Sequence, residues 1–487
     1  MENNGIGETV MIFSSYEFLL LFFPMVTAGY WLLNHFKCFE LAKIWLIAAS
    51  FYFYSQGSPA FFPFFLGSVL ANYVLGITLC LIRGEEKHLQ RKLALLIGVI
   101  GNVVLLGYYK YMNFFLENLN ALAGTDFVMK KLALPIGISF FTFQLIAFLV
   151  DCYRGETKQY NITEYLLFIT FFPQLIVGPI VHHAEITPQF EIPENRKFHQ
   201  RNVSLGIFIF AIGCAKKMLL ADPMNESAAE FYNNIHSSVP MWESWFYTLE
   251  YCLSYYFDLS GYTDMAIGLA LFFNIHLPQN FNAPWKARNM QEYWQRQHMT
   301  LSRFLGGYVF KNVFRKGCWW RNYYIATMAT FLVSGIWHGA GWNFIIWGLM
   351  NGVLVCIGAW EKYHKKYPPY LVGAGFTFIW IILTRVIFVA KNMSDTMTVY
   401  RSMLDLPALF SMGWQQFVSE FSHFVVHHQK LGLLVVISLG ICWFAPTTKE
   451  MAEKFKPDWK HFLYVGVLMA VCLTKMNQVV QFLYFQF

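Results

Sequence analysis

Long apolar runs separated by short polar loops recur along the whole chain. A helix crosses the roughly 30 Å hydrocarbon core of a bilayer in about 20 residues. Measured against that length, the pattern predicts about eleven spanning helices, with a few shorter buried or re-entrant pieces. The first run, residues 16–33, follows a segment with no basic region and no small-residue cleavage site, so we expect a retained helix and not a signal peptide. The predicted fold class is all-α, a polytopic transmembrane helical bundle.

The composition supports this class. Of the 487 residues, 56% are hydrophobic, 19% aromatic and 13% charged, a balance far from that of soluble domains. The nine cysteines are scattered singly without a C-x-x-C pair, so we interpret them as small core residues and not as disulfides or metal ligands. The net charge of +7 would suit nucleic-acid binding, but Lys and Arg cluster in short loops between spans. We therefore expect membrane lipid as a partner and no nucleic acid.

Charge also predicts which loops face the cytoplasm. Basic clusters occur at residues 83–92, 311–321, 362–366 and 449–460, and the positive-inside rule assigns all four to the cytoplasm. The segments 222–240 and 395–422 carry more acid than base, so we place them outside. Lys216 and Lys217 conflict with this assignment, because they lie near the outer end of a span. We expect them to face a headgroup or a polar cavity.

One ionisable side chain, His338, stands inside the apolar run FLVSGIWHGAGWNF, residues 331–344. Because the clusters at 311–321 and 362–366 are both cytoplasmic, the chain between them must cross outward and return. Glycines at 339 and 341 favour a tight turn at the apex. The sixteen residues from Tyr323 to His338 correspond to roughly 24 Å of helix, short of a full crossing. We therefore expect the imidazole in the outer half of the membrane, reached through a water-filled depression.

An ionisable side chain inside a membrane is costly and usually marks a functional pathway. The alternative for His338 is a structural histidine that bonds a neighbouring backbone group and holds two helices together. The residues around it combine close backbone approach with large apolar walls: Trp337, Gly339, Gly341, Trp342 and Asn343. That combination favours a pocket at His338 over a tightly packed interface between two helices.

A second unusual stretch spans residues 257–304. We expect its first polar residues to cluster at the start of a short apolar helix: Asp258, Ser260, Tyr262 and Asp264. A broken loop with two prolines follows, and then Trp294, Arg296 and His298. Irregular backbone at membrane depth is tolerated only where it is buried in protein or lines a cavity, so this segment is predicted to wall an internal chamber. The alternative is an amphipathic helix on the cytoplasmic face, whose arginines contact anionic lipid.

At these residues the chain resembles the membrane-bound O-acyltransferases, in particular the branch of alginate and peptidoglycan O-acetyltransferases and the teichoic-acid D-alanyl transfer protein. The resemblance covers nearly the whole chain. Its landmarks, in the expected order, are IFSSYEFLLLFF (12–23), GYYKYMNFF (107–115), PIGISFFTFQLIAFLVDCYRGE (135–156), FPQLIVGPI (172–180), FDLSGYTDMAIGL (257–269) and SGIWHGAGWNFIIWGLMNG (334–352). It implies a helical bundle built around a funnel and a tunnel.

The resemblance also implies roles for individual residues. The catalytic histidine of the family's W-H-G motif falls on His338, and the second family histidine falls on His298 within WQRQHMTLS. The chain departs from the family pattern at three places. Gln297 stands where the family has a tryptophan, and GGYVF (306–310) lacks the aspartate of the family's version. Val389 stands where an arginine is expected, and Arg385, one turn earlier, could take the place of that arginine. The residues that we expect to line the substrate cavity are Asp258, Tyr262, Asp264, Arg296, Trp337, Asn343, Phe482 and Phe487.

The chain ends QVVQFLYFQF. We predict a transmembrane acyltransferase domain over residues 1–474 and an extracytoplasmic tail over residues 475–487, too apolar to stay in water and too short to cross again. Phe482, Tyr484 and Phe487 form an F-x-Y-x-x-F pattern that resembles the C-terminal motif of the small partner protein in teichoic-acid D-alanylation. The resemblance implies that Tyr484 enters the funnel from outside and carries the acyl group. The alternative is an aromatic plug or an interfacial belt.

Together these features predict an O-acyltransferase of the cell membrane that uses a cytoplasmic thioester donor, acetyl-CoA or an acyl carrier protein, and no bound cofactor. The family suggests an extracytoplasmic SGNH-type acyltransferase as partner and a polysaccharide as acceptor, with acetyl favoured as the acyl group. The alternatives are D-alanyl transfer to teichoic acid and a proton-coupled transporter that uses the same polar residues. We expect no metal site: the histidine pairs 182–183 and 427–428 are adjacent in sequence, and no Cys or carboxylate stands at regular ligand spacing.

Overall fold

A computed structural model describes residues 11–82, 87–130, 132–157, 161–235, 239–314 and 319–476. The regular structure in these ranges is helical, and they contain no β-strand, which confirms the predicted all-α class. Two compact units share the chain. Unit 1 takes residues 1–211, 264–278 and 456–479, and unit 2 takes residues 212–263, 279–455 and 480–487.

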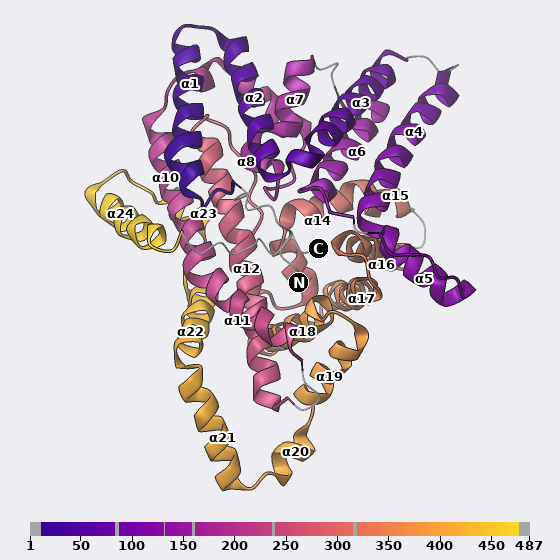
Figure 1. Cartoon of the computed structure of the whole chain (residues 1–487), viewed down its shortest axis with the longest axis vertical. Coiled ribbons are helices and arrows are strands. Elements are labelled where there is room, and N and C mark those ends of the chain that lie inside the picture. The colour runs from indigo at the N-terminus through magenta and orange to yellow at the C-terminus, as the bar shows by residue number, and fades with distance from the viewer. Residues whose placement is uncertain are drawn as a thin grey trace. The chain divides into compact units, whose positions relative to one another are not determined.

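The helices of unit 1 belong mainly to the first two-fifths of the sequence. They are η1 (Glu17–Phe22), α1 (Phe23–His35), α2 (Phe39–Gly57), η2 (Pro59–Phe61), α3 (Phe62–Leu81), α4 (His88–Leu106), η4 (Gly107–Tyr111), α5 (Met112–Ala123), α6 (Ile138–Arg154), α7 (Ile162–Thr170), α8 (Phe172–Leu175), α9 (His183–Glu191), η5 (Pro193–Arg196), α10 (Gln200–Ala215) and α24 (Trp459–Leu473). Helices α1 and α2 pack side by side, and α6 packs against both α3 and α4 (Figure 1).

Aromatic rings form much of the core of unit 1. Phe18, in a π-helical turn ahead of α1, is fully buried. Its ring lies 5.6 Å from that of Phe53 on α2 and 6.1 Å from that of Phe172 on α8. Edge-to-face pairs at such distances add about 0.5–1.5 kcal/mol beyond the burial of their area. These contacts hold the buried segment around α8 against the first two long helices.

Unit 2 carries the landmark at residues 334–352 and the first part of the landmark at residues 257–269. Its helices are η6 (Lys216–Ala221), α11 (Asp222–Asn233), α12 (Met241–Leu271), η7 (Pro284–Lys286), α13 (Met290–Arg296), α14 (Met299–Leu305), η8 (Gly306–Phe310), α15 (Lys311–Val313), α16 (Trp319–His338), α17 (Trp342–His364), α18 (Tyr370–Val389), α19 (Met393–Met403), α20 (Leu406–Ser411), α21 (Trp414–His427), α22 (Gln429–Phe444) and α23 (Thr448–Glu453). The last residues of α10 lie in unit 2, and the last residues of α12 lie in unit 1. Within unit 2, α17 packs between α16 and α18.

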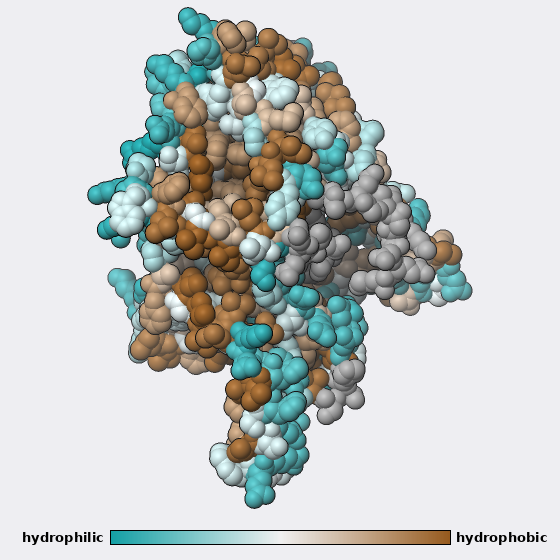
Figure 2. Space-filling model, turned by 60° about the vertical axis from the view of Figure 1, so that its left-hand side comes forward, coloured by the Kyte–Doolittle hydropathy of each residue, from teal (hydrophilic) through white to brown (hydrophobic). Residues whose placement is uncertain are grey.

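The outer faces of several helices suit a bilayer. Within the described ranges, six helices are long and apolar enough to cross a membrane, and the bent pair α21–α22 would make a seventh. Leu21 on η1, Val74 on α3 and Ile97 on α4 are each more than half exposed, and Figure 2 shows apolar side chains covering much of the surface in that view. Exposed apolar faces of this extent are stable in lipid and not in water. The protein is therefore a multi-pass membrane protein, although the predicted count of about eleven spans is not confirmed.

One expectation about local structure changes. Asp258, Ser260, Tyr262 and Asp264 do not start a short helix, because they lie within the 31-residue helix α12. The unbroken helix forms because no proline or helix-ending turn separates Met241 from Leu271. The F-x-Y-x-x-F pattern, including Phe482, Tyr484 and Phe487, lies outside the described residues.

Candidate active site

His338 ends α16, and the turn at residues 339–341 leads directly into α17, as the glycines predict. The two helices come unusually close. A β-carbon added at Gly335 would lie 2.5 Å from the carbonyl oxygen of Phe344 and 3.2 Å from the α-carbon of Gly348. Only glycine fits such a crossing, and small residues at a helix interface are typical of membrane bundles. The hairpin therefore presses His338 against the first turns of α17.

The imidazole of His338 is only 2% exposed. Its Nδ1 lies 2.6 Å from the backbone carbonyl oxygen of Ser334, one turn earlier on α16. A carbonyl can only accept, so Nδ1 carries the proton in this bond, and Nε2 is then the basic nitrogen of the neutral ring. A hydrogen bond to the backbone is the sign expected of a structural histidine. The same bond leaves Nε2 unprotonated, which is the tautomer that a general base needs.

Aromatic rings enclose His338. Its ring centroid lies 4.9 Å from that of Trp337, 4.7 Å from that of Trp347 on α17 and 5.7 Å from that of Phe388 on α18. Such walls exclude water and strengthen electrostatic interactions inside the site.

A buried guanidinium lies behind Phe388. Arg385 is 5% exposed, and it lies 4.8 Å from the centroid of the Phe388 ring and 3.9 Å from that of Tyr255 on α12. Within the described part of the chain, no carboxylate lies within 4.0 Å of it, and its Nε and Nη1 have no hydrogen-bond partner. Cation–π contacts offset part of the cost of burying this charge, but its unused donors suit an anionic or carbonyl oxygen.

A narrow cavity of about 180 Å³ runs beside α16. Polar residues at helical spacing line it along one face of this helix: Tyr323, Thr327, Thr330 and Ser334. From α13 and α14 it is lined by Gln291, Trp294, Gln295, Leu301, Ser302 and Leu305. Since Ser334 holds His338, the cavity reaches the turn of α16 that positions the imidazole.

Most residues of the irregular stretch at 279–301 are buried or half-buried, although Asn282, Arg288 and Gln295 are exposed, and the stretch breaks into η7, α13 and α14 and forms no single amphipathic helix. His298, between α13 and α14, has a left-handed backbone with φ +49° and is 4% exposed. This conformation is uncommon outside glycine, and strained residues often cluster at functional sites. Asn280 holds the turn, because its carbonyl accepts from Met299 N at 2.8 Å and its side chain accepts from Thr300 N at 3.1 Å.

Burial governs the charge of His298. The residue lies outside the candidate spanning helices, packed against the Phe281 ring. Loss of solvation lowers the pKa of its imidazole to about 4, against a weaker opposing effect of a backbone hydrogen bond. His298 is therefore neutral near pH 7. Trp294, one turn before it, packs edge to face against Trp347 with ring centroids 5.7 Å apart, so both histidine segments contact the same tryptophan.

Comparison with known proteins identifies the chain. Residues 109–360, which include both histidines, match the model of the membrane-bound O-acyltransferase family. The chain belongs to this family. It is 34% identical to the peptidoglycan O-acetyltransferase of Helicobacter pylori, with 98% of each protein covered. It is 30% identical to a Pseudomonas putida protein named "Probable alginate O-acetylase AlgI", with 98% of this chain and all of that protein covered. The teichoic acid D-alanyltransferase of Bacillus subtilis is 29% identical over 51% of this chain and 65% of its own length.

In this O-acyltransferase the other predicted site residues fall into different environments. Trp337 is part of the aromatic wall. Asn343 donates to the carbonyl of Ala390 at 3.2 Å and so ties the start of α17 to the end of α18. Arg296 pairs with Glu292 at 2.8 Å. Burial opposes ionisation of Glu292, but hydrogen bonds from the Arg288 backbone and Arg296 still hold the pKa of this carboxyl below its usual value.

The two predicted cavity aspartates of α12, Asp258 and Asp264, are buried. Asp258 forms an ion pair with Lys217 at 2.7 Å, and Lys217 also pairs with Asp222 at 2.6 Å. These carboxylates explain why a lysine stands at the wrong end of a span: its charge is neutralised inside the protein. Tyr262 and Asp264 are both buried within α12. The placement of Asp258 thus supports a structural role in the O-acyltransferase more than contact with substrate.

Sequence reasoning missed parts of the site. Trp347 and Phe388 carry no signal that separates them from ordinary core aromatics. Arg385, named from the sequence only as a substitute for the arginine expected at position 389, does carry such a signal: it is the only charged residue in the apolar helix α18, and buried charges in membrane helices are costly.

Proposed function

We propose that the protein transfers an acetyl group from a cytoplasmic thioester, acetyl-CoA or an acyl carrier protein, to an extracytoplasmic cell-surface polysaccharide. The two relatives described above that are named for O-acetylation each align with 98% of the chain, whereas D-alanyl relatives from Bacillus subtilis and Streptococcus thermophilus align with 51% and 65% of it. This difference favours acetyl over D-alanyl. The protein would reside in the cytoplasmic membrane, with its C-terminus outside.

The observation that carries the mechanism is the bond from His338 Nδ1 to the Ser334 carbonyl. With Nδ1 protonated, Nε2 removes the proton of an acceptor hydroxyl as its oxygen attacks the thioester carbonyl. The carbon–sulfur bond of the tetrahedral intermediate then breaks, and the thiolate leaves with the proton that His338 took up. General-base assistance of this kind contributes about 10²–10⁴-fold.

Arg385 would stabilise the negative charge that forms on the thioester oxygen. Its guanidinium is buried and shares the Phe388 ring with His338, so both groups belong to one small, water-poor site. Fixed donors in such a site stabilise a developing oxyanion far better than they would in water. His298, neutral and buried, would orient the donor from the other side of Trp347.

The cavity beside α16 gives the donor a path. Its polar face starts at Tyr323, next to the basic cluster at residues 311–321, and ends at Ser334. A thioester arm that enters at the cytoplasmic end would reach Ser334 after about 16 Å of helix, at 1.5 Å per residue, and His338 one turn later. The acceptor would approach from outside.

Tyr484 is proposed as the first acceptor. A phenol, with a pKa of about 10, is more acidic than a sugar hydroxyl, and its ester is a good donor for a second transfer. An extracytoplasmic SGNH-type protein would pass the acetyl group from Tyr484 to the polysaccharide. Phe482 and Phe487 would anchor the tail by burial, worth about 1.5–3 kcal/mol each if complete.

Intact-protein mass spectrometry after incubation with isotopically labelled acetyl-CoA tests this proposal. The native protein should gain one acetyl group on Tyr484, and Tyr484→Phe and His338→Ala should not. His364→Ala changes an exposed histidine on α17 and should be acetylated normally. Acetylation of His338→Ala at the native rate would refute the base, and labelling that survives in Tyr484→Phe would refute the carrier. If acetyl-Tyr484 accumulates when the extracytoplasmic SGNH-type partner is deleted, the acetyl group passes from Tyr484 to that partner.

A further inference from the structure

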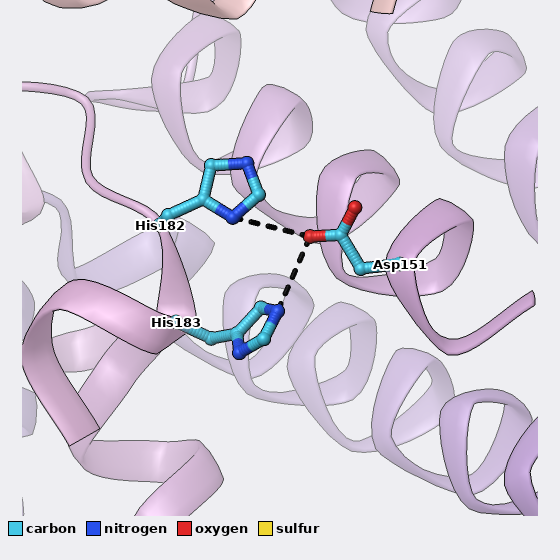
Figure 3. Close-up of side chains that lie close together, drawn as sticks. All are labelled: Asp151, His182 and His183. Carbon is cyan, nitrogen blue, oxygen red and sulfur yellow. Dashed lines mark ion pairs between the residues drawn. The ribbon is translucent and has the colours of Figure 1, made fainter. Parts of the chain in front are cut away.

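A second group of chemically active side chains lies in unit 1, apart from the residues used above. Asp151, near the end of α6, projects toward His182 and His183 (Figure 3). One carboxylate oxygen, Oδ2, lies 3.3 Å from His182 Nδ1 and 3.3 Å from His183 Nε2. The side chains of Asp151 and His183 are 1% and 4% exposed, whereas that of His182 is 36% exposed. Residue spacing in the sequence does not reveal this group, because the carboxylate comes from a helix distant in sequence.

The local backbone explains how neighbouring histidines reach one atom. Side chains of consecutive extended residues point to opposite sides. Here His182 is extended, with φ −90° and ψ +147°, and His183 is the first residue of α9. The change from extended to helical backbone between them turns both rings to the same side, where α6 presents Asp151.

The distances fit shared coordination better than hydrogen bonding. A charge-assisted bond between an imidazole N–H and a carboxylate is typically about 2.7–2.9 Å long. Atoms bound to one tetrahedral zinc ion at about 2.0–2.1 Å lie about 3.3–3.4 Å apart. Both nitrogen–oxygen distances in the cluster are 3.3 Å, and the three ligand atoms lie within 4.8 Å of one another.

We propose that Asp151, His182 and His183 bind a divalent transition-metal ion of the zinc class. Imidazole nitrogens favour zinc and its neighbours over calcium and magnesium, which prefer oxygen ligands. A water molecule would supply the fourth ligand from the side of His182, whose side chain is 36% exposed.

The ion would serve unit 1 as a structural clamp. It would tie the end of α6 to the start of α9. Residues 176–181, which join α8 to this site, are buried and not helical. Residues 176–181 lack the regular hydrogen bonds of a helix, so a metal ion bound at the end of this segment would hold it in place.

Zinc binding to the purified full-length protein in detergent tests the proposal. Exposed histidines must be removed first, because His423 and His427 lie one turn apart on α21 with their rings stacked 6.2 Å apart and would bind zinc weakly on any protein. In the His423→Ala/His427→Ala background, after treatment with a chelator, we expect about one zinc ion per chain. Asp151→Asn, which keeps the shape of the side chain, and His183→Ala should each weaken binding at least about tenfold.

Cobalt gives a second readout that does not depend on activity. Tetrahedral cobalt absorbs visible light far more strongly than hydrated cobalt, so the background protein should develop this absorption and Asp151→Asn should not. His182→Gln, at the half-exposed position, gives a variant whose folding is least at risk. Unchanged zinc stoichiometry and affinity in Asp151→Asn and His182→Gln would overturn the site, as would a background protein that binds no zinc.

Discussion

At the scale of single residues, the two histidines are held in place by different contacts. His338 is held by a backbone carbonyl within its own helix. His298 is held by its left-handed backbone, by Asn280 and by an aromatic ring. A structural and a catalytic interpretation of His338 therefore do not exclude each other. The bond that orients the ring is the one that prepares its second nitrogen.

The lowered pKa of His298 predicts a dependence of stability on pH. Between its ordinary pKa of 6.5 and its folded value of about 4, the unfolded chain binds a proton that the folded protein does not. Stability should therefore fall as the pH drops below about 6.5, by about 2 kcal/mol at pH 5 from this group. His298→Asn removes the titration and keeps a residue type that tolerates the left-handed backbone. Thermal unfolding in detergent at pH 8 and pH 5 should show a smaller pH effect in the variant, and equal effects would contradict the assignment.

Arg385 is predicted to act on the rate of transfer. Arg385→Gln removes the positive charge and should lower kcat by about 10²–10³-fold, with a smaller change in KM, because the guanidinium would act mainly on the charge that forms in the transition state. Arg385→Lys should recover part of the rate, since it restores charge without the planar fork. Arg401→Gln, at an exposed position on α19, is the matched control. A loss confined to KM would assign Arg385 to donor binding instead.

At the scale of elements, α16 combines a lipid-facing side with a polar face that lines the cavity. Thr330→Trp should fill the cavity and lower transfer at least about tenfold, because a misplacement of the donor by about 1 Å can cost far more than that. Ile336→Trp adds the same ring at an exposed position on the same helix and should leave the rate nearly unchanged. Initial rates at several donor concentrations separate the variants. Equal rates in both would exclude this cavity as the donor path.

The buried ion pairs that join α12 to η6 and α11 should be essential to stability. Lys217→Met leaves the carboxylates of Asp222 and Asp258 buried without their cation, a change that costs about 3–5 kcal/mol in buried pairs. Lys449→Met removes one partner of an exposed pair on α23 and should cost at most about 0.5 kcal/mol. Thermal unfolding in detergent measures both. Adding Asp222→Asn and Asp258→Asn should restore part of the loss; if it does not, the lysine acts through its packing.

At the scale of the whole molecule, the sequence predicted the helical class, the turn at residues 339–341 and the buried irregular segment. Each of these depends on local features, such as apolar run length, glycine and proline. The pairings of Lys217 with Asp258 and of Asp151 with His182 could not be predicted, because they depend on which helices pack together. The length of α16 also differs from the expected length. Because α16 begins at Trp319, the helix that ends at His338 is about 30 Å long, whereas roughly 24 Å was expected.

Sidedness is the property of the whole molecule on which the mechanism depends, and it can be measured directly. The hydrogen bond from Asn343 to Ala390 places the turn after His338 and the end of α18 together, while the loop that contains Lys366 lies at the other end of α17 and α18. Since α18 is the one candidate span between the exposed residues Lys366 and Ser411, these residues should lie on opposite sides of the membrane.

In intact spheroplasts, a membrane-impermeant thiol reagent should therefore label Ser411→Cys and not Lys366→Cys, because the basic cluster at 362–366 stays in the cytoplasm. The native chain measures the background from its own cysteines, and permeabilised cells should allow both positions to be labelled. The reverse pattern would place the His338 end of the hairpin at the cytoplasmic face. The donor would then have to reach the cavity beside α16 from outside, which the supply of cytoplasmic thioesters does not allow.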